Sequence, residues 1–559
     1  SKEICDKFNE YFVTIGPKLD SKIESSTVNF KNFLPNGVKD SFYINPTTPD
    51  EIVNIISHCK NKLSSGWDNI PMTIVKAVGI CIAAPFAHIC NLSFLSGIFP
   101  SDMKIAKVTP IYKNDATDEF SNYRPISLLP NFSKIIEKLM FNRLSDFLNK
   151  YKVLYEQQYG FRQNYSTDFA LIELSEKIAE AIDKKRFTLG IFVDLSKAFD
   201  TLNHSILLHK LSTYGIRGIS NDWFRNYLEK REQFVTCYGI NSISRYIVTG
   251  VPQGSILGPL LFLLYINDIS NSSKLLKFIL YADDTNIFHS DDDIVKLCND
   301  VNGELLSVIQ WFKANRLSVN LKKTTFLIFG SDKKIKTLAN NCEICLDNIK
   351  LSRAKTVKFL GVVIDDNLSW AGHINYIKGK MAKNVGIINR LKFRLSEATL
   401  NSLYNTLVLP YLNYGNVIWA SNKPTRLKPI LLLQKRLMRI ITCSHYNAHT
   451  LPLFARLKQL TVFDLNELLI ATFMYRHYNN DLPDIFNDYF YRNSNIHEHF
   501  TRHSTKLHIS FARTDCMKSQ LSIRGPKLWN SINPVIINNS LHWHSFKKQY
   551  KKFLLSKYV

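Results

Sequence analysis

One stretch decides the fold of this chain: Phe278-Ile279-Leu280-Tyr281-Ala282-Asp283-Asp284-Thr285-Asn286-Ile287-Phe288. Two short apolar runs flank an acidic turn, and this pattern predicts a β-hairpin with two carboxylates at its tip. Asp is common in ordinary turns, so the pair taken alone indicates only a hairpin. Adjacent carboxylates repel each other, however, and a bound cation would relieve that repulsion.

A third carboxylate, Asp194, stands at the end of another apolar run, residues 189–193. Taken alone, it fits equally well a strand-end acid that caps a nearby amide. Acids on neighbouring strands supply the oxygen ligands that Mg²⁺ prefers, and Mg²⁺ also bridges to substrate phosphates. Two such ions can activate an attacking hydroxyl and stabilise a leaving pyrophosphate in one in-line displacement. The three aspartates together therefore predict a two-magnesium site.

The segments around these acids resemble the motifs of reverse transcriptases. Residues 191–200 (IFVDLSKAFD) resemble motif A, residues 250–259 (GVPQGSILGP) resemble motif B, and residues 281–284 (YADD) resemble motif C. They occur in the family's order and at similar spacing. From about Ser65 to its C-terminus, the chain resembles reverse transcriptases of non-LTR retrotransposons, of the jockey type.

The resemblance implies a fold of the α/β (α+β) class. We expect a right-hand polymerase with fingers, a ferredoxin-like palm with an antiparallel sheet, and a helical thumb. The expected domains are an N-terminal helical extension with a pre-fingers block (1–92), the reverse transcriptase domain of fingers and palm (93–365), the helical thumb (366–470), and a basic C-terminal region of unknown role (471–559).

The resemblance also assigns the metal ligands. It implies that Asp194 and Asp283 hold two Mg²⁺ ions, with Mn²⁺ as a substitute, and that Asp284 supports them from the edge. The main-chain carbonyl of Leu195 would supply a further oxygen.

Five further residues match positions that contact the nucleotide in the resembling enzymes. Lys113 and Arg124 would contact the triphosphate from the fingers, Arg through a bidentate fork and Lys as a point charge. Phe199, five residues after the motif A acid, would lie under the sugar and exclude a ribose 2′-hydroxyl. Gln253 would lie beside the incoming nucleotide and the template base, and Gly254 would permit close backbone approach.

The segment 317–324 (LSVNLKKT) resembles motif D. Its Lys323 matches a lysine that protonates the departing pyrophosphate as a general acid. Lys322 is adjacent, so the assignment between the two lysines stays open.

The overall charge is that of a protein with a polyanionic partner. Lys and Arg number 71 against 47 Asp and Glu, which gives a net charge of +24. Nucleic acid is the first expectation and an anionic membrane surface the second. Because the basic residues are spread along the chain, we expect an extended groove for a phosphate backbone. The resemblance names template RNA, primer DNA and dNTPs as partners, with an endonuclease domain upstream in the same polyprotein.

The ten cysteines have no disulfide-like spacing, and the chain begins without an apolar signal segment. The longest apolar run, residues 259–266, is too short to span a bilayer, so no membrane partner is expected. We therefore expect free thiols in a reducing, intracellular setting, in nucleus and cytoplasm as a ribonucleoprotein. The missing initiator Met suggests a piece of a longer polyprotein.

Local patterns predict several elements. Helices are expected near the N-terminus, from Asp50 as N-cap through His58, and over 74–95, 133–148 and 167–183. A strand is expected over 106–113, and Asn203 or His204 would cap the helix after motif A. Residues 358–362 resemble the motif E hairpin, and a helical, basic thumb is expected from Asn375.

The cysteine and histidine patterns are weaker. Cys342 and Cys345 form a lone CxxC, for which two strand cysteines are the better interpretation because zinc needs four ligands. His497, His499 and His503 with Cys516 are a better zinc candidate, though still a poor one.

Two other functions stay open. One is an inactive or domesticated copy that only binds RNA, against which the intact acids argue. The other is a group II intron maturase-like protein, whose polymerase motifs are similar. The block around Trp67 and residues 524–529 (RGPKLW) favour a retrotransposon enzyme.

Overall fold

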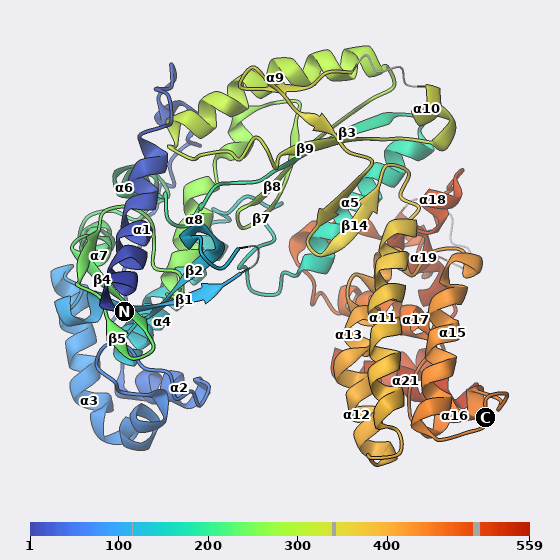
Figure 1. The fold of residues 1–559 in the computed structure, drawn as a ribbon. Coiled ribbons are helices and arrows are strands. Elements are labelled where there is room, and N and C mark those ends of the chain that lie inside the picture. The colour runs from blue at the N-terminus through green and yellow to red at the C-terminus, as the bar shows by residue number, and fades with distance from the viewer. Residues whose placement is uncertain (114–115, 338–341, 496–503, 559) are drawn as a thin grey trace.

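The computed structural model describes residues 1–113, 116–337, 342–495 and 504–558. Two lobes stand on either side of a central sheet, which joins them at the top of the view in Figure 1. The N-terminal half of the chain builds one lobe together with the sheet, and the C-terminal third builds an all-helical lobe on the other side. This arrangement agrees with the expected fingers, palm and thumb.

The central sheet has five strands in the order β12-β9-β3-β8-β7. Its strands are β3 (Phe187–Val193), β7 (Lys277–Tyr281), β8 (Asp284–Asp291), β9 (Thr325–Phe329) and the short β12 (Ser352–Arg353). All pairings among β3, β7, β8 and β9 are antiparallel. Taken in chain order, these four strands have the 4-1-3-2 arrangement of a ferredoxin-like β-α-β-β-α-β unit. The palm prediction is confirmed.

Helices cover both faces of this sheet. One face packs on α9 (Ile294–Ala314) and the other on α5 (Thr167–Asp183). Successive side chains of a β-strand point to opposite faces of the sheet. In β3, Leu189, Ile191 and Val193 therefore belong to one hydrophobic core and Phe192 belongs to the other. The connection from β3 to β7 contains α6 (His204–Thr213), α7 (Ile219–Leu228) and α8 (Leu257–Ile266).

The fingers lobe is built around a second sheet, in which β1 lies between β2 and β4. Its strands are β1 (Ile105–Tyr112), β2 (Tyr123–Leu128), β4 (Arg231–Cys237), β5 (Ile240–Asn241) and β6 (Arg245–Ile247). Its helices are α1 (Lys2–Asp20), α2 (Pro49–His58), α3 (Met72–Ser96) and α4 (Asn131–Lys150). The apolar stripe of α1 packs Phe8 and Phe12 against β1 and β4, so this N-terminal helix is part of the lobe.

Local chemistry explains where these helices begin. The prediction of Asp50 as an N-cap is wrong: Thr48 caps α2 by accepting a hydrogen bond from the Glu51 amide, because Pro49 provides the first helical turn. The helix after motif A is capped by Asn203, whose side chain accepts from the amides of Ser205 and Ile206. Helix α3 ends at Gly97, which adopts a left-handed conformation with φ of 70°.

Helix α3 also bears on the question of a membrane. The run at 259–266 forms the buried helix α8. Of the helices in the described ranges, only α3 is long and apolar enough to cross a bilayer by length and composition. Helix α3 packs on α2, α4 and α7 and buries Val75, Phe86 and Phe94, while its other face leaves Ile80 and Leu95 exposed.

The helical lobe follows the motif E hairpin of β13 (Thr356–Phe359) and β14 (Val362–Asp365). Its thumb helices are α11 (Ala371–Leu391), α12 (Glu397–Leu407), α13 (Leu409–Asn413), α14 (Asn416–Trp419), α15 (Pro424–Ile441) and α16 (Leu451–Arg456). The Tyr414 hydroxyl donates to the Leu360 carbonyl at 2.5 Å and so fastens the lobe to the hairpin turn.

The C-terminal region shares the core of the thumb. Its helices are α17 (Val462–Tyr478), α18 (Asp515–Lys518), α19 (Leu521–Trp529), α20 (Pro534–Asn538) and α21 (Trp543–Ser556). Helix α17 runs across the boundary expected at residue 470. In one hydrophobic core, Phe546 and Tyr550 of α21 lie with Leu437 of the thumb and Phe192 of the palm.

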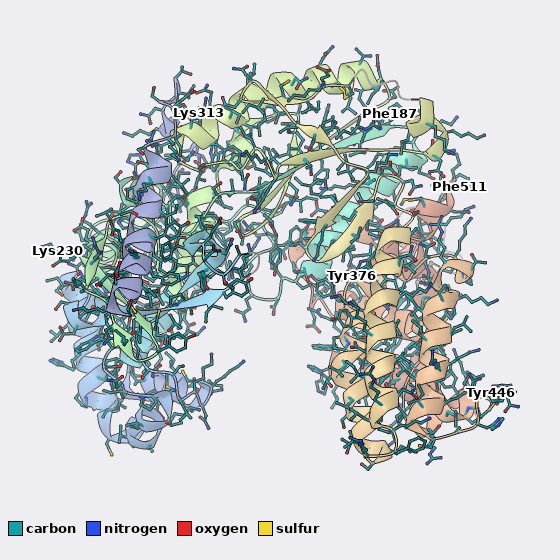
Figure 2. The ribbon with its side chains drawn as sticks, viewed as in Figure 1. Phe187, Lys230, Lys313, Tyr376, Tyr446 and Phe511 are labelled. Atoms are coloured by element: carbon teal, nitrogen blue, oxygen red, sulfur yellow. A yellow bond between two sulfur atoms is a disulfide. The ribbon has the colours of Figure 1, made fainter. Side chains whose placement is uncertain are left out.

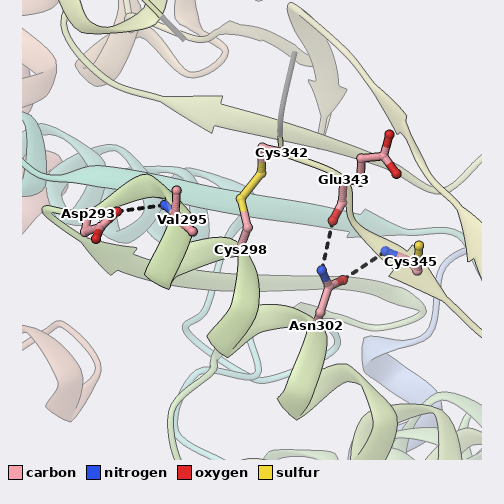
Figure 3. The surroundings of a disulfide bond; sticks show 7 residues. All are labelled: Asp293, Val295, Cys298, Asn302, Cys342, Glu343 and Cys345. Atoms are coloured by element: carbon pink, nitrogen blue, oxygen red, sulfur yellow. Dashed lines mark hydrogen bonds between the residues drawn. A yellow bond between two sulfur atoms is a disulfide. The ribbon is translucent and has the colours of Figure 1, made fainter. Parts of the chain in front are cut away.

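A disulfide contradicts the expectation that all cysteines are free. Cys298 on α9 is bonded to Cys342, with the Cα atoms 6.1 Å apart (Figure 3). Asn302, one turn further along α9, donates to the Glu343 carbonyl and accepts from the Cys345 amide, so the bond joins two segments that already pack together. A separation of 44 residues gives no spacing signal, because only tertiary packing brings the two cysteines together. Cys345 remains a free, exposed thiol.

The fold contains a fully buried ion pair that predicts a large effect on stability. Lys210 of α6 donates to Asp268 Oδ1 and to the Tyr265 carbonyl, both at 2.6 Å. Lys210→Ala would leave the Asp268 carboxylate buried without its cation, and we expect a loss of about 3–5 kcal/mol in the free energy of unfolding. Chemical denaturation with circular dichroism measures this loss.

The matched control is Lys296→Ala, which removes an exposed partner of Asp291. We expect its midpoint to stay within error of the wild type, because exposed ion pairs contribute little. Equal midpoints for the two variants would contradict a structural role for the Lys210 pair.

Candidate active site

The acidic turn lies at the end of the central sheet. Strands β7 and β8 pair antiparallel from Lys277 opposite Phe288 to Tyr281 opposite Asp284, which leaves Ala282 and Asp283 as the two turn residues. Ala282 has a φ of 55°, as a tight two-residue hairpin turn requires. Asp283 therefore occupies the tip, and Asp284 is the first residue of β8.

Strand β3 brings the third acid to the same end. It pairs with β8, and the last pair in the register is Val193 opposite Thr285. The next residue along β3 is Asp194, and the residue preceding Thr285 is Asp284. The register thus directs two acids from distant parts of the sequence to the same end of adjacent strands, beside the Asp283 turn.

The three carboxylates interact electrostatically. Loss of hydration in the protein, with repulsion from Asp283 and then Asp194, raises the pKa of Asp284 to about 6. The pKa of Asp283 is also raised, by desolvation and by repulsion from Asp194. Like charges held close in a partly dehydrated site attract cations.

Cations from the fingers face these acids. Lys113 follows β1, and Arg124 lies on β2 opposite Ile111. Both oppose the rise in the pKa of Asp283, so they lie within electrostatic reach of its carboxylate. Lys197 joins them: desolvation lowers its pKa, Asp200 opposes this, and Lys113, Arg124 and Lys323 lower it further. The predicted phosphate-binding cations and the predicted metal ligands therefore share one region.

The motif D segment is fastened to the backbone of motif A. The Asn320 amide donates to the Asp194 carbonyl at 2.8 Å, and the Ser196 amide donates to the Ser318 carbonyl at 2.9 Å. Leu195 lies opposite Val319 between these two bonds, so its carbonyl points away from residues 318–320. The side chains of Lys322 and Lys323 are both exposed on this segment, and the choice between them stays open.

The motif B loop is enclosed by motif A and the fingers. Gln253 donates through Nε2 to Asp200 Oδ1 at 2.8 Å, and its carbonyl accepts from the Ser127 amide at 2.8 Å. Gly254 has a φ of 125°, and a Cβ there would lie 2.6 Å from the Ser127 carbonyl oxygen. The Gln253 amide is thus engaged by Asp200, a residue to which the sequence assigned no role. Its predicted nucleotide contact stays a prediction.

Asp200 is the second acid of motif A and is distinct from Asp194, Asp283 and Asp284. Desolvation raises its pKa to about 6, against which the Gln253 donor and Lys197 act. Its partner is the motif B glutamine, so it positions the loop. The only indication of its importance in the sequence is that it is the last residue of the segment 191–200, which resembles motif A.

Phe199 is held by other aromatic rings. Its ring stacks on Phe262 of α8 with centroids 4.6 Å apart, and the edge of Phe161 meets it at 6.2 Å. The side chain is only half-buried, so part of the ring remains open beside motif A. A ring backed in this way is a rigid surface.

The side chain of Gln158 braces the acidic turn, a contact that the sequence analysis did not predict. Residues 157–159 pair with Leu280 at the edge of β7, and the buried Gln158 side chain accepts through Oε1 from the amides of Gly160 and Ala282. A Cβ on Gly160 would lie 2.3 Å from the Ala282 nitrogen, so only glycine allows this approach.

The structure bears on two predicted metal sites, the three aspartates and the zinc candidate near Cys516. Within the described ranges, no group of three or more His, Cys, Asp or Glu side chains converges closely enough to hold a metal ion. The three aspartates offer the oxygen donors that Mg²⁺ prefers, but their side chains would have to turn toward a shared ion. Of the zinc candidate, His497, His499 and His503 lie outside the described residues, while Cys516 is a half-buried thiol whose pKa burial raises to about 12.

The brace predicts the effect of Gln158→Ala. The variant leaves the buried Ala282 amide without an acceptor, at an expected cost of about 1–3 kcal/mol, and loosens the turn. Hydrogen exchange at Ala282 should accelerate while exchange in α9 is unchanged. The exposed Gln163→Ala is the matched control. Unchanged exchange at Ala282 in Gln158→Ala would refute the brace.

Comparison with known proteins agrees with this geometry. A family model described as reverse transcriptase (RNA-dependent DNA polymerase) matches residues 111–364. The chain is 31% identical over 433 residues to a probable RNA-directed DNA polymerase from transposon BS of Drosophila melanogaster, which covers 74% of this chain and 46% of the relative. It is 25% identical over 468 residues to the RNA-directed DNA polymerase from mobile element jockey of the same species, covering 81% of this chain and 50% of the relative.

A more distant relative is the retrovirus-related Pol polyprotein from type-1 retrotransposable element R1 of Bradysia coprophila, 25% identical over 439 residues, with 74% of this chain and 42% of the relative covered. The chain spans about half the length of the curated relatives it matches. It therefore contains a domain of the reverse transcriptase (RNA-dependent DNA polymerase) family at residues 111–364, and its homologues are RNA-directed DNA polymerases of non-LTR retrotransposons.

Proposed function

We propose that this chain extends a DNA primer on an RNA template, as the RNA-directed DNA polymerase of a non-LTR retrotransposon. One observation carries the proposal: Asp194, Asp283 and Asp284 meet at one end of the palm sheet, and cations of the fingers face them. Negative ligands for metal ions beside positive groups for phosphates are what nucleotidyl transfer needs.

Reverse transcriptases generally use divalent metal ions, and we propose the three aspartates as the ligands of two Mg²⁺ ions, with Mn²⁺ as a substitute. When bound, the ions would supply activation of the primer 3′-hydroxyl and charge neutralisation at the pyrophosphate. The Leu195 carbonyl, which points away from residues 318–320, is a further oxygen donor. The raised pKa of Asp284 supports this assignment, because the repulsion behind it is relieved by a cation.

The remaining residues bind and orient the substrate. Lys113 and Arg124 hold the triphosphate, and Lys197 adds positive charge on the motif A side. Lys323 donates a proton to the departing pyrophosphate from the segment that is hydrogen-bonded to motif A. Gln253 donates a hydrogen bond to Asp200, and this bond holds the motif B loop in position beneath the nucleotide.

Phe199 selects deoxyribose in this proposal. The stacking of its ring on Phe262 supports this role, because a ring held in place would collide with a ribose 2′-hydroxyl above it. The partners are template RNA, primer DNA and dNTPs. The relatives are named for transposable elements, which favours this function over that of an intron maturase.

The proposal predicts the effect of Asp283→Asn. This isosteric change removes one metal-binding charge, so Mg²⁺-dependent extension of oligo(dT) on poly(rA) should fall by at least about 100-fold. The exposed Asp292→Asn is the control and should extend normally. Absence of Mg²⁺-dependent extension by the wild type would favour a copy that only binds RNA.

A second prediction concerns Phe199→Val. A smaller side chain opens the space under the sugar, so the ratio of ribonucleotide to deoxyribonucleotide incorporation should rise by about tenfold or more. Steady-state incorporation of rNTPs and dNTPs on one primer–template measures this ratio. Phe161→Val, which alters only the ring at the edge of Phe199, should change it much less. Full dNTP selectivity in Phe199→Val would exclude Phe199 as the selecting residue.

A further inference from the structure

A pocket lies at the end of the helical lobe that is remote from the palm. It has a volume of about 610 Å³ and is formed by the C-terminal ends of α11 and α15 and by the loop that follows α15. We call it the tip pocket and define it by Lys392, Phe393, Arg436, Arg439, His445 and Tyr446. Helix α11 starts directly after the motif E hairpin, and its 21 residues span about 31 Å, so the tip pocket is far from the acidic turn.

The charge of the tip pocket is wholly positive. Lys392, Arg436 and Arg439 line it, and in the described part of the chain no Asp or Glu does so. Arg436 is exposed, and Arg439 uses only Nε on the Ala448 carbonyl, at 3.0 Å. Three cations without an acidic neighbour form a site for several phosphates.

Two aromatic rings project into solvent at the same place. Phe393 is 84% exposed and Tyr446 is 80% exposed, among the most exposed aromatic side chains of the protein. Lys392 lies over the Phe393 ring, 4.6 Å from its centroid, and the His445 ring lies 4.7 Å from that of Tyr446. Most of each ring is nevertheless exposed to solvent, and an exposed ring face is a surface on which a base can stack.

The loop that carries Tyr446 is held in shape. Arg439 binds the Ala448 carbonyl, the Ala448 amide donates to the His445 carbonyl, and the Ser444 amide donates to the Arg439 carbonyl. His445 is also hydrogen-bonded to Asn447. The exposed ring therefore stands on a preformed loop, which lowers the entropy lost when a ligand binds.

We propose that the tip pocket binds single-stranded nucleic acid, with bases stacked on Phe393 and Tyr446 and phosphates held by Lys392, Arg436 and Arg439. A duplex hides its base faces, so it would use the cations but not the rings. Figure 2 shows Tyr376 on the side of the helical lobe that faces the fingers lobe and Tyr446 at the opposite lower corner. The strand held there is therefore outside the proposed polymerase site, and the inference does not depend on polymerase activity.

The experiment uses the full chain and a fluorescein-labelled 12-nucleotide single strand of mixed sequence, as RNA and as DNA, with the blunt duplex for comparison. Fluorescence anisotropy gives the affinity. Photocrosslinking of a 5-bromouracil-substituted strand, followed by peptide mapping, gives the site. The test variant is Phe393→Ala/Tyr446→Ala. The control is Phe511→Ala, which removes a ring that is 90% exposed on the same lobe but outside the tip pocket.

We expect the double variant to lose the crosslink to the tip pocket and to bind single strands about tenfold or more weakly. Phe511→Ala should bind like the wild type. Arg436→Gln should make the salt dependence shallower by about 0.7 in log–log slope, and Lys428→Gln, an exposed cation on the same helix outside the pocket, should not. Tighter binding of either RNA or DNA supports the proposal and identifies the strand.

Wild-type affinity in the double variant would overturn the proposal, as would an equal loss in Phe511→Ala. Primer extension on a short, blunt-ended primer–template serves as the folding control, because all substituted side chains are exposed. If the tip pocket does not bind single strands but primer extension is intact, the proposed function still holds. If single strands crosslink to the tip pocket but the chain does not extend primers, the tip-pocket proposal still holds.

Discussion

The structure depends on holding three like charges close together. Asp194, Asp283 and Asp284 repel one another, yet the β3–β8 register and the β7–β8 turn bring them to the same end of the palm sheet. Much of the surrounding structure keeps them there. Gln158 holds the turn from one side, Asn320 holds the Asp194 carbonyl from the other, and the fingers cations oppose the negative charge. Hydrogen bonds therefore hold the backbone segments that carry the acids, and lysine and arginine side chains oppose their charge.

The fingers and palm are joined at motif B rather than merely adjacent. The Gln253 carbonyl accepts from Ser127 of β2, and its side chain donates to Asp200 of motif A. Gly254 permits this because a side chain would collide with the Ser127 carbonyl. These two hydrogen bonds connect β2 of the fingers to the segment that bears Phe199 and Asp200.

Much of the fold could be predicted because short segments of the sequence carry the patterns typical of helices, caps and hairpins. Two short apolar runs predicted the hairpin at Asp283, and helix signals predicted α5 and offered Asn203 or His204 as a cap, of which Asn203 is the one observed. Contacts between distant segments had no local signal. Thr48 replaced Asp50 as a cap because Pro49 can begin a helix, and the Cys298–Cys342 bond and the Gln158 brace exist only after the chain has packed. The assignment of roles to the site residues came from resemblance, and the structure adds their proximity.

The two hydrophobic cores are completed at different points during synthesis of the chain. The core on the α9 side of the palm sheet is complete once residues up to Leu351 have emerged, whereas the core on the α5 side also needs Phe546, Tyr550 and Tyr558 from the last helix and its end. Until the ribosome releases that helix, α5 already packs on this face of the sheet, but the core that it shares with Phe192, Phe288 and Phe329 still lacks the side chains of α21. During synthesis the palm sheet can therefore pack on both of its helices before the core on the α5 side is complete, and an incomplete core exposes apolar surface.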